Sequence, residues 1–251
     1  MKKEIQIKSK VKIIKNYILS NIFFRFFKLL LNPLKFFRKI KNFSNEKKSV
    51  VKINWKLRAD KHGKYSVIDT RTPKEEFDFV TNLQKKIMFL NLRKYLSGKE
   101  KKVLDFGCGA GRFSEELTKI NNQASVLAID TEKKLIDIAK RKKRVNFMHI
   151  RRLDQIHSSF DLIFIANVLG GIEKNELYKI KNFFIRKLNK GGILFLTEHV
   201  SKSKIIKKEI LKEWSNRNDE FYLTLFRKIS LKKIDEYKYL QNDTSIYIGK
   251  K

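Results

Sequence analysis

The chain has 251 residues, with 58 lysines and arginines against 26 aspartates and glutamates, which gives a formal net charge of +32. Hydrophobic residues make up 42% of the sequence, enough to form a core, so a mainly disordered protein is excluded. The single cysteine, Cys108, excludes an internal disulfide and leaves a structural zinc cluster without ligands, and we expect no metal and a reducing compartment.

The charge is concentrated in the first segment, residues 1–45, and just beyond it. Residues 1–58 hold fourteen lysines and three arginines against two glutamates. From Asn21 to Ile40 the polar residues recur at helical spacing, and nearly all other positions are Phe, Leu or Ile. A membrane span needs about 20 consecutive apolar residues, and basic residues interrupt the apolar runs of this segment, which argues against a span. We expect basic amphipathic helices, with a break at Pro33, that lie on an anionic membrane surface; a lid on the protein's own core and contact with nucleic acid are alternatives.

Residues 46–98 are predicted to form a cap region. The stretch from Asn54 to Pro73 is predicted to be an ordered loop, and the apolar spacing from Lys74 to Leu96 predicts an amphipathic helix. We expect three polar residues of the loop to close over a site in the main domain: His62, Tyr65 and Arg71.

Residues 99–251 alternate between strand and helix patterns. Strands are predicted at 101–106, 125–130, 145–150, 160–167 and 191–200, and helices at 112–120, 132–143, 175–189 and 202–214. Two further strands flank the turn-prone Asn242 and Asp243. The order predicts an α/β, Rossmann-like fold with a seven-stranded, mostly parallel sheet and an antiparallel C-terminal hairpin.

The turn between the first strand and helix reads VLDFGCGAGR, from Val103 to Arg112. Its three glycines let the backbone pass close under a ligand, and the helix that follows offers free N–H groups. Arg112 stands where a dinucleotide-binding turn needs its last glycine, and no Gly-Lys-Ser or Gly-Lys-Thr follows, as a phosphate loop requires. Asp105 before the turn suits a cationic ligand and would repel a phosphate.

The segment VLDFGCGAGRFS resembles the first motif of class I S-adenosylmethionine-dependent methyltransferases. VLAIDTEKKLIDIA, FDLIFIANVLGGI and KLNKGGILFLTEH resemble later segments of the same family, so the resemblance covers residues 99–199. It implies S-adenosyl-L-methionine as the cofactor. The cofactor-binding residues that it implies are Asp105, Gly107, Cys108, Gly109, Arg112, Asp130, Thr131, Asp154 and Asn167.

The resemblance gives roles to some of these residues. It implies that Asp130 accepts hydrogen bonds from both ribose hydroxyls and that Asp154 contacts the adenine, although Asp154 as a surface acid is an alternative. Arg112 either meets the cofactor's carboxylate or lies on the helix surface, and Cys108 is a small residue of the turn rather than a nucleophile.

Two residues at the end of the fifth predicted strand are the candidate catalytic residues. Glu198 or His199 would act as general base toward a hydroxyl acceptor, and His199 is preferred because imidazole titrates near neutral pH. An orienting or capping role is the alternative for both. We expect Arg217 and Tyr222 to approach the site from the C-terminal side.

Scattered segments, such as W-x-x-R-A-x-x-H-G and the terminal T-S-I-Y-I-G-K, resemble methyltransferases of bacterial surface-glycan or lipid pathways. The prediction is an enzyme that O-methylates a small-molecule, glycan or lipid-linked acceptor, located in the cytoplasm and peripheral at the inner membrane face. One alternative is a nucleic-acid (RNA) methyltransferase that uses the basic surface. The other is a non-catalytic cofactor-binding relative, against which the retained acids argue.

Overall fold

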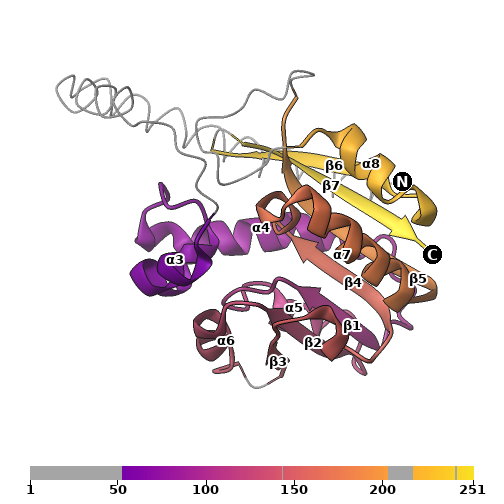
Figure 1. Ribbon diagram of the computed structural model, residues 1–251, viewed down its shortest axis with the longest axis horizontal. Helices are drawn as coiled ribbons and strands as arrows, with labels where there is room; N and C mark the ends of the chain where they lie inside the picture. The colour runs from indigo at the N-terminus through magenta and orange to yellow at the C-terminus, as the bar shows by residue number, and fades with distance from the viewer. Residues whose placement is uncertain (1–52, 143, 203–216, 241) are drawn as a thin grey trace, which may run out of the picture.

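The computed structural model describes residues 53–142, 144–202, 217–240 and 242–251 (Figure 1). The predicted amphipathic segment at 1–45 and nearly all of the predicted helix at 202–214 lie outside these residues. Seven strands of the described residues form one sheet: β1 Lys102–Phe106, β2 Ser125–Asp130, β3 Asn146–His149, β4 Phe160–Ala166, β5 Leu188–Val200, β6 Lys232–Tyr239 and β7 Asn242–Lys250.

The strand order is β3-β2-β1-β4-β5-β7-β6. β1 pairs in parallel with β2 and β4, and β3 and β5 extend this parallel set on either side. β7 is antiparallel to both β5 and β6. The predicted Rossmann-like sheet with an antiparallel C-terminal hairpin is therefore confirmed.

The hairpin turn comes earlier in the chain than predicted. Asn242 and Asp243 belong to β7, where they pair with Tyr239 and Lys238 of β6. Leu240, with a φ of 53°, begins the reversal of the chain. Asp243 also pairs with the last residue of β5, so β7 extends along β5 to its end, and this long pairing outweighs the turn preference of Asn and Asp.

Helices cover both faces of the sheet (Figure 1). The described α-helices are α3 Trp55–His62, α4 Phe77–Leu92, α5 Ser114–Leu117, α6 Lys133–Ala139, α7 Lys174–Lys187 and α8 Asp219–Leu225. Buried apolar side chains join α4 and α5 to one face and α7 and α8 to the other. None of the helices in the described part of the chain is long and apolar enough to cross a membrane.

Short helices account for the main differences from the predicted elements. The stretch after Asn54 is not a loop but helix α3, because the Asn54 side chain accepts the Leu57 N–H at 3.0 Å and caps the helix. Only Ser114–Leu117 of the predicted helix at 112–120 is α-helical, and α6 ends at Ala139. Beyond α6, the Lys142 ammonium donates to the carbonyl of Gly111 at 2.5 Å and so contacts the glycine turn.

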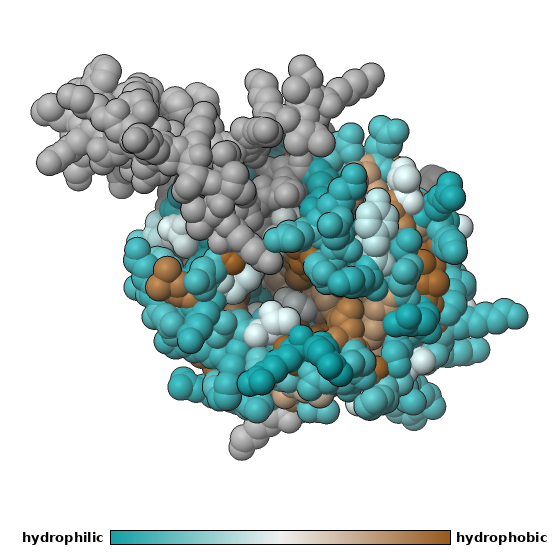
Figure 2. All heavy atoms as spheres, viewed as in Figure 1, coloured by the Kyte–Doolittle hydropathy of each residue, from teal (hydrophilic) through white to brown (hydrophobic). Residues whose placement is uncertain are grey.

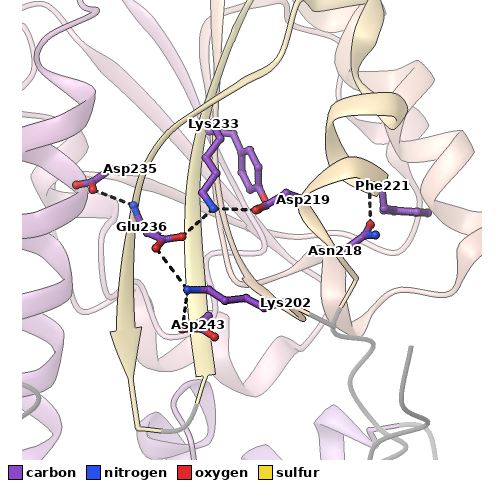
Figure 3. Close-up of polar contacts among 9 residues, drawn as sticks. Lys202, Asn218, Asp219, Phe221, Lys233, Asp235, Glu236 and Asp243 are labelled. Atoms are coloured by element: carbon purple, nitrogen blue, oxygen red, sulfur yellow. Dashed lines mark hydrogen bonds and ion pairs between the residues drawn. The ribbon is translucent and has the colours of Figure 1, made fainter. Parts of the chain in front are cut away.

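Polar contacts tie α8 to the C-terminal hairpin (Figure 3). The Lys233 ammonium donates to Asp219 at 2.7 Å and to Glu236 at 2.8 Å. Lys202, which follows β5, pairs with Glu236 at 3.4 Å and with Asp243 at 3.5 Å. The chain just after β5 and the start of α8 are therefore both attached to the hairpin.

Candidate active site

A cavity of about 850 Å³ lies at the carboxyl ends of β1, β2 and β4. Open α/β sheets bind ligands at this edge, where the strand order reverses, and here the reversal falls between β1 and β4. Figure 2 shows a hollow on this face with hydrophobic atoms inside and hydrophilic residues around it. Trp55 and Val67 of the cap and several residues of α7 complete the wall. The volume is within the range of roughly 300–1,000 Å³ that is usual for small-molecule sites.

The glycine turn after β1 forms one side of the cavity. Gly107 and Gly109 have φ angles of 71° and 55°, in the left-handed region that favours glycine. A Cβ on Gly107 would lie 2.6 Å from Val168, and a Cβ on Gly109 would lie 2.7 Å from Val67. The turn is therefore packed between the cap and the chain after β4, with no room for side chains.

Asp105 ends up in the cavity wall near the end of β1, with 3% of its surface exposed. Its carboxylate accepts a 2.6 Å hydrogen bond from Ser114 Oγ. Burial raises the pKa of Asp105 to about 7; the Ser114 bond opposes this shift and neighbouring Asp130 adds to it. A cationic partner stabilises the ionised form of a buried carboxylate that has only one hydrogen-bond donor. This position therefore fits the ammonium or sulfonium of S-adenosylmethionine.

Asp130, at the end of β2, also lines the cavity, followed by Thr131. Its Oδ2 accepts the Gly109 N–H and its Oδ1 accepts the Glu132 N–H, each at 2.8 Å. Burial raises the pKa of Asp130, and these backbone hydrogen bonds oppose the shift. A carboxylate offers about four acceptor positions, so roughly two remain, which suits the two hydroxyls of a ribose.

Arg112 lines the cavity and joins it to the cap. Its guanidinium donates to Thr81 Oγ1 at 3.2 Å, to the carbonyl of Val67 at 3.1 Å and to the side chain of Gln84. It also lies over the ring of Phe113, 4.7 Å from the centroid. Arg112 therefore holds the cap against the glycine turn and does not lie on the helix surface, and its contact with the cofactor's carboxylate stays a prediction.

Of two further predicted cofactor residues, Cys108 lines the cavity and Asp154 does not. Cys108 is buried at the turn, and burial raises the pKa of its thiol, which does not favour a nucleophile. The structure places Asp154 outside the cavity wall, as an exposed acid paired with Arg152 at 2.5 Å. Leu153 lines the cavity instead, because η3 (Leu153–Gln155) turns the next side chain outward. The structure therefore does not support the adenine contact predicted for Asp154, and the surface alternative fits.

The chain after β4 forms the wall opposite the glycine turn. Asn167 lines the cavity with a φ of 56°, and its N–H donates to the carbonyl of Thr197 at 2.8 Å. Glu198, by contrast, is fully buried behind this wall and accepts hydrogen bonds from backbone N–H groups of the chain after Asn167. The structure therefore brings Asn167, but not Glu198, to the cavity surface.

His199 lies beside the cavity rather than in its lining. Its Nδ1 is 2.8 Å from Thr244 Oγ1 on β7. Burial lowers the pKa of His199 to about 4; Asp69 of the cap opposes this shift, and Arg112 and Arg71 add to it. The imidazole is therefore neutral at physiological pH. Its role as general base stays a prediction.

The sequence analysis did not predict the apolar residues of the cavity wall as site residues. Trp55 and Val67 lie in the cap, and Val168 and Ile172 follow β4. They carry no chemical signature, and only their positions beside the glycine turn and Asn167 would have pointed to them.

The fold and this pair of acids around a bare glycine turn define a class I S-adenosylmethionine-dependent methyltransferase. Asp105, Asp130 and the turn fit the cofactor by charge, acceptor positions and space. The chain belongs to the methyltransferase domain family, whose model matches residues 97–244.

Known proteins agree with this assignment. The chain is 31% identical over 130 residues to malonyl-(acyl-carrier protein) O-methyltransferase of Bacillus anthracis, a match that covers 48% of each protein. It is 32% identical over 106 residues to the mitochondrial ubiquinone biosynthesis O-methyltransferase of Schizosaccharomyces pombe, which covers 39% of this chain and 37% of that protein. The matches thus span half or less of these relatives.

Solved structures show the likeness of fold. The crystal structure of magnesium protoporphyrin IX methyltransferase from Synechocystis with bound SAH has a TM-score of 0.54 and 14% sequence identity. The match covers 78% of this chain and 92% of that one.

Proposed function

We propose that this methyltransferase methylates an oxygen atom of a glycan or lipid-linked acceptor at the inner face of the membrane. The observation that carries the proposal is the position of Trp55, which lines the cavity only ten residues after the predicted basic segment at 1–45. An acceptor held at the surface that this segment contacts would thus lie next to the cavity. The two curated relatives, both named O-methyltransferases, support oxygen as the methylated atom.

Different residues of the site would have different roles in such a reaction. When bound, S-adenosylmethionine supplies a methyl group activated by its sulfonium. Asp105 and Asp130 bind and orient the cofactor, and proximity then supplies much of the rate. His199 is the candidate base on the side of the acceptor.

The acceptor class is tested with a cell extract and methyl-labelled S-adenosylmethionine. We expect label in the glycan or lipid fraction, resistant to nuclease and reduced with the Asp105→Asn variant. Label that nuclease releases would contradict the proposal and support the RNA alternative. Saturable cofactor binding with no labelled product in any fraction would support the non-catalytic alternative.

The membrane location is tested by sedimentation with vesicles. We expect the full chain to pellet with vesicles of anionic phospholipid and not with neutral phosphatidylcholine vesicles, since each basic residue near an anionic surface adds about 1 kcal/mol. A variant that starts at Glu46 should stay in the supernatant while its affinity for the cofactor is unchanged. Equal sedimentation of the two proteins would remove the membrane part of the proposal and leave the acceptor part untouched.

A further inference from the structure

The backbone N–H groups of the loop after β4 converge on one carboxylate. Glu198 accepts hydrogen bonds from Val168 at 2.8 Å, Leu169 at 2.6 Å and Gly170 at 3.2 Å. Asn167 begins the turn with its left-handed φ of 56°. Successive N–H groups arranged in this way form a nest for an anion, and here the anion is a side chain of the protein itself.

The carbonyl groups of the same loop are held by a buried cation. Arg217 donates from Nη1 to the carbonyl of Leu169 at 2.8 Å and from Nη2 to that of Ile172 at 2.7 Å. Its backbone forms a parallel bridge with Val200 at the end of β5. The next residue, Asn218, caps α8 by accepting the Phe221 N–H at 2.9 Å (Figure 3). The backbone of Arg217 is therefore held by β5 and α8, and its guanidinium extends from there to the loop.

The opposite side of the loop faces the cavity. Val168, Gly171 and Ile172 line it. Val168 also lies directly against the glycine turn, since a Cβ on Gly107 would be 2.6 Å from it. The backbone position of this loop therefore fixes the distance between the two walls that enclose the cofactor.

We propose that Glu198 and Arg217 are positioning residues that together set the width of the cofactor site through the 168–172 loop. Both are buried, at 0% and 9% exposure, and neither lines the cavity among the described residues. Removing either would leave backbone groups of the loop without partners in a buried place, and the loop would shift to find new ones.

The protonation of Glu198 fits this role. Burial raises the pKa of Glu198 to about 7, against the three N–H groups and Arg217, which favour the ionised form. The negative charge of the Glu198 carboxylate also contributes to the raised pKa of the Tyr222 hydroxyl. Both carboxylate oxygens accept loop N–H groups, and protonation would turn one of them into a donor that faces an N–H, so acidification below pH 7 should loosen the loop.

The test is Glu198→Gln, measured by calorimetry with S-adenosylhomocysteine and by hydrogen exchange. Glutamine turns an N–H₂ toward a loop N–H or toward Arg217. We expect the Kd for S-adenosylhomocysteine to rise at least about tenfold and the amides of 168–170 to exchange faster. A general base would behave differently: kcat would fall while this Kd and the amide exchange stayed at their original values, and that result would overturn the proposal.

Further variants separate positioning from misfolding. Arg217→Lys keeps the charge but can serve the two carbonyls less well, so we expect a smaller rise in Kd than for Arg217→Met. Glu220→Gln makes the same chemical change on the exposed side of α8 and should leave Kd and exchange unaltered. In a double-mutant cycle, Val168→Ala and Glu198→Gln should be non-additive, because both act through one loop. Full additivity, with the same loss in Arg217→Lys and Arg217→Met, would contradict the proposal.

Discussion

Replacing Asp105 with asparagine is expected to weaken S-adenosylmethionine binding by about 10- to 150-fold, which corresponds to the roughly 1.5–3 kcal/mol of a hydrogen bond to a charged group. Asparagine still accepts the Ser114 hydroxyl, so the loss comes from the charge. Asp130→Asn should weaken binding similarly, because its N–H₂ would face the Gly109 or the Glu132 N–H. Calorimetry measures both variants.

Asp154→Asn is the matched control, since this acid is exposed and outside the cavity wall. It should bind the cofactor like the unchanged protein. Unaltered affinity in both Asp105→Asn and Asp130→Asn would show that the cofactor does not bind at this turn.

The raised pKa of Asp105 makes the same interaction depend on pH. In the protein without cofactor the carboxyl has a pKa of about 7, against 3.8 in the unfolded chain. The unfolded state therefore loses this proton first, and the contribution of Asp105 to the free energy of unfolding falls as the pH rises from 4 to 7. A cationic ligand favours the carboxylate, so its affinity should rise with pH over the same range and binding should release protons. The dependence of cofactor affinity on pH should be weaker in Asp105→Asn, where only the contribution of Glu198 remains. An unchanged dependence would contradict the role of Asp105.

Gly107→Ala is expected to raise the cofactor Kd about 100-fold or more. The new Cβ would lie 2.6 Å from Val168 on a residue with a φ of 71°. Left-handed backbone costs a non-glycine residue about 1–2 kcal/mol and overpacking adds about 1–3 kcal/mol, so the loop after β4 must move. The same calorimetric titration measures the effect.

Gly98→Ala is the control for backbone strain alone, because Gly98 has a φ of 81° but nothing within 4 Å of the added Cβ. It should lower the melting temperature without changing cofactor affinity. Adding Val168→Ala to Gly107→Ala should restore part of the binding. No restoration by Val168→Ala would mean that the two walls do not meet as the structure shows.

The parallel part of the sheet was predictable because each buried strand is a short apolar run that ends where a helical pattern or a turn begins. Asp105 and Asp130 could be found because each ends such a run, and the carboxyl ends of parallel strands lie at one edge. Helix α3 was missed because only Ala59 of its residues is buried, so it has no apolar stripe to read. The sequence signal for this helix was its N-terminal capping residue, Asn54.

The remaining site residues depended on finer geometry. Asp154 is displaced from the cavity by one position, since Leu153 takes the wall and a 3₁₀ turn directs the acid outward. Glu198 and His199 are neighbours on a strand, and neighbouring strand residues point to opposite faces. That rule alone shows that the two could not both face one acceptor, whereas the loop that Glu198 holds could not be read from spacing.

The placement of β7 has a consequence for how the chain reaches its native state. β5 pairs on one side with β4 and on the other with residues 243–250, and its last residue, Val200, also bridges to Arg217. During synthesis β5 is complete well before its second neighbour emerges, and until then it exposes an unpaired apolar edge in the middle of the future sheet. Such an edge favours association with other nascent chains, so slow insertion of the last strand is expected to promote aggregation.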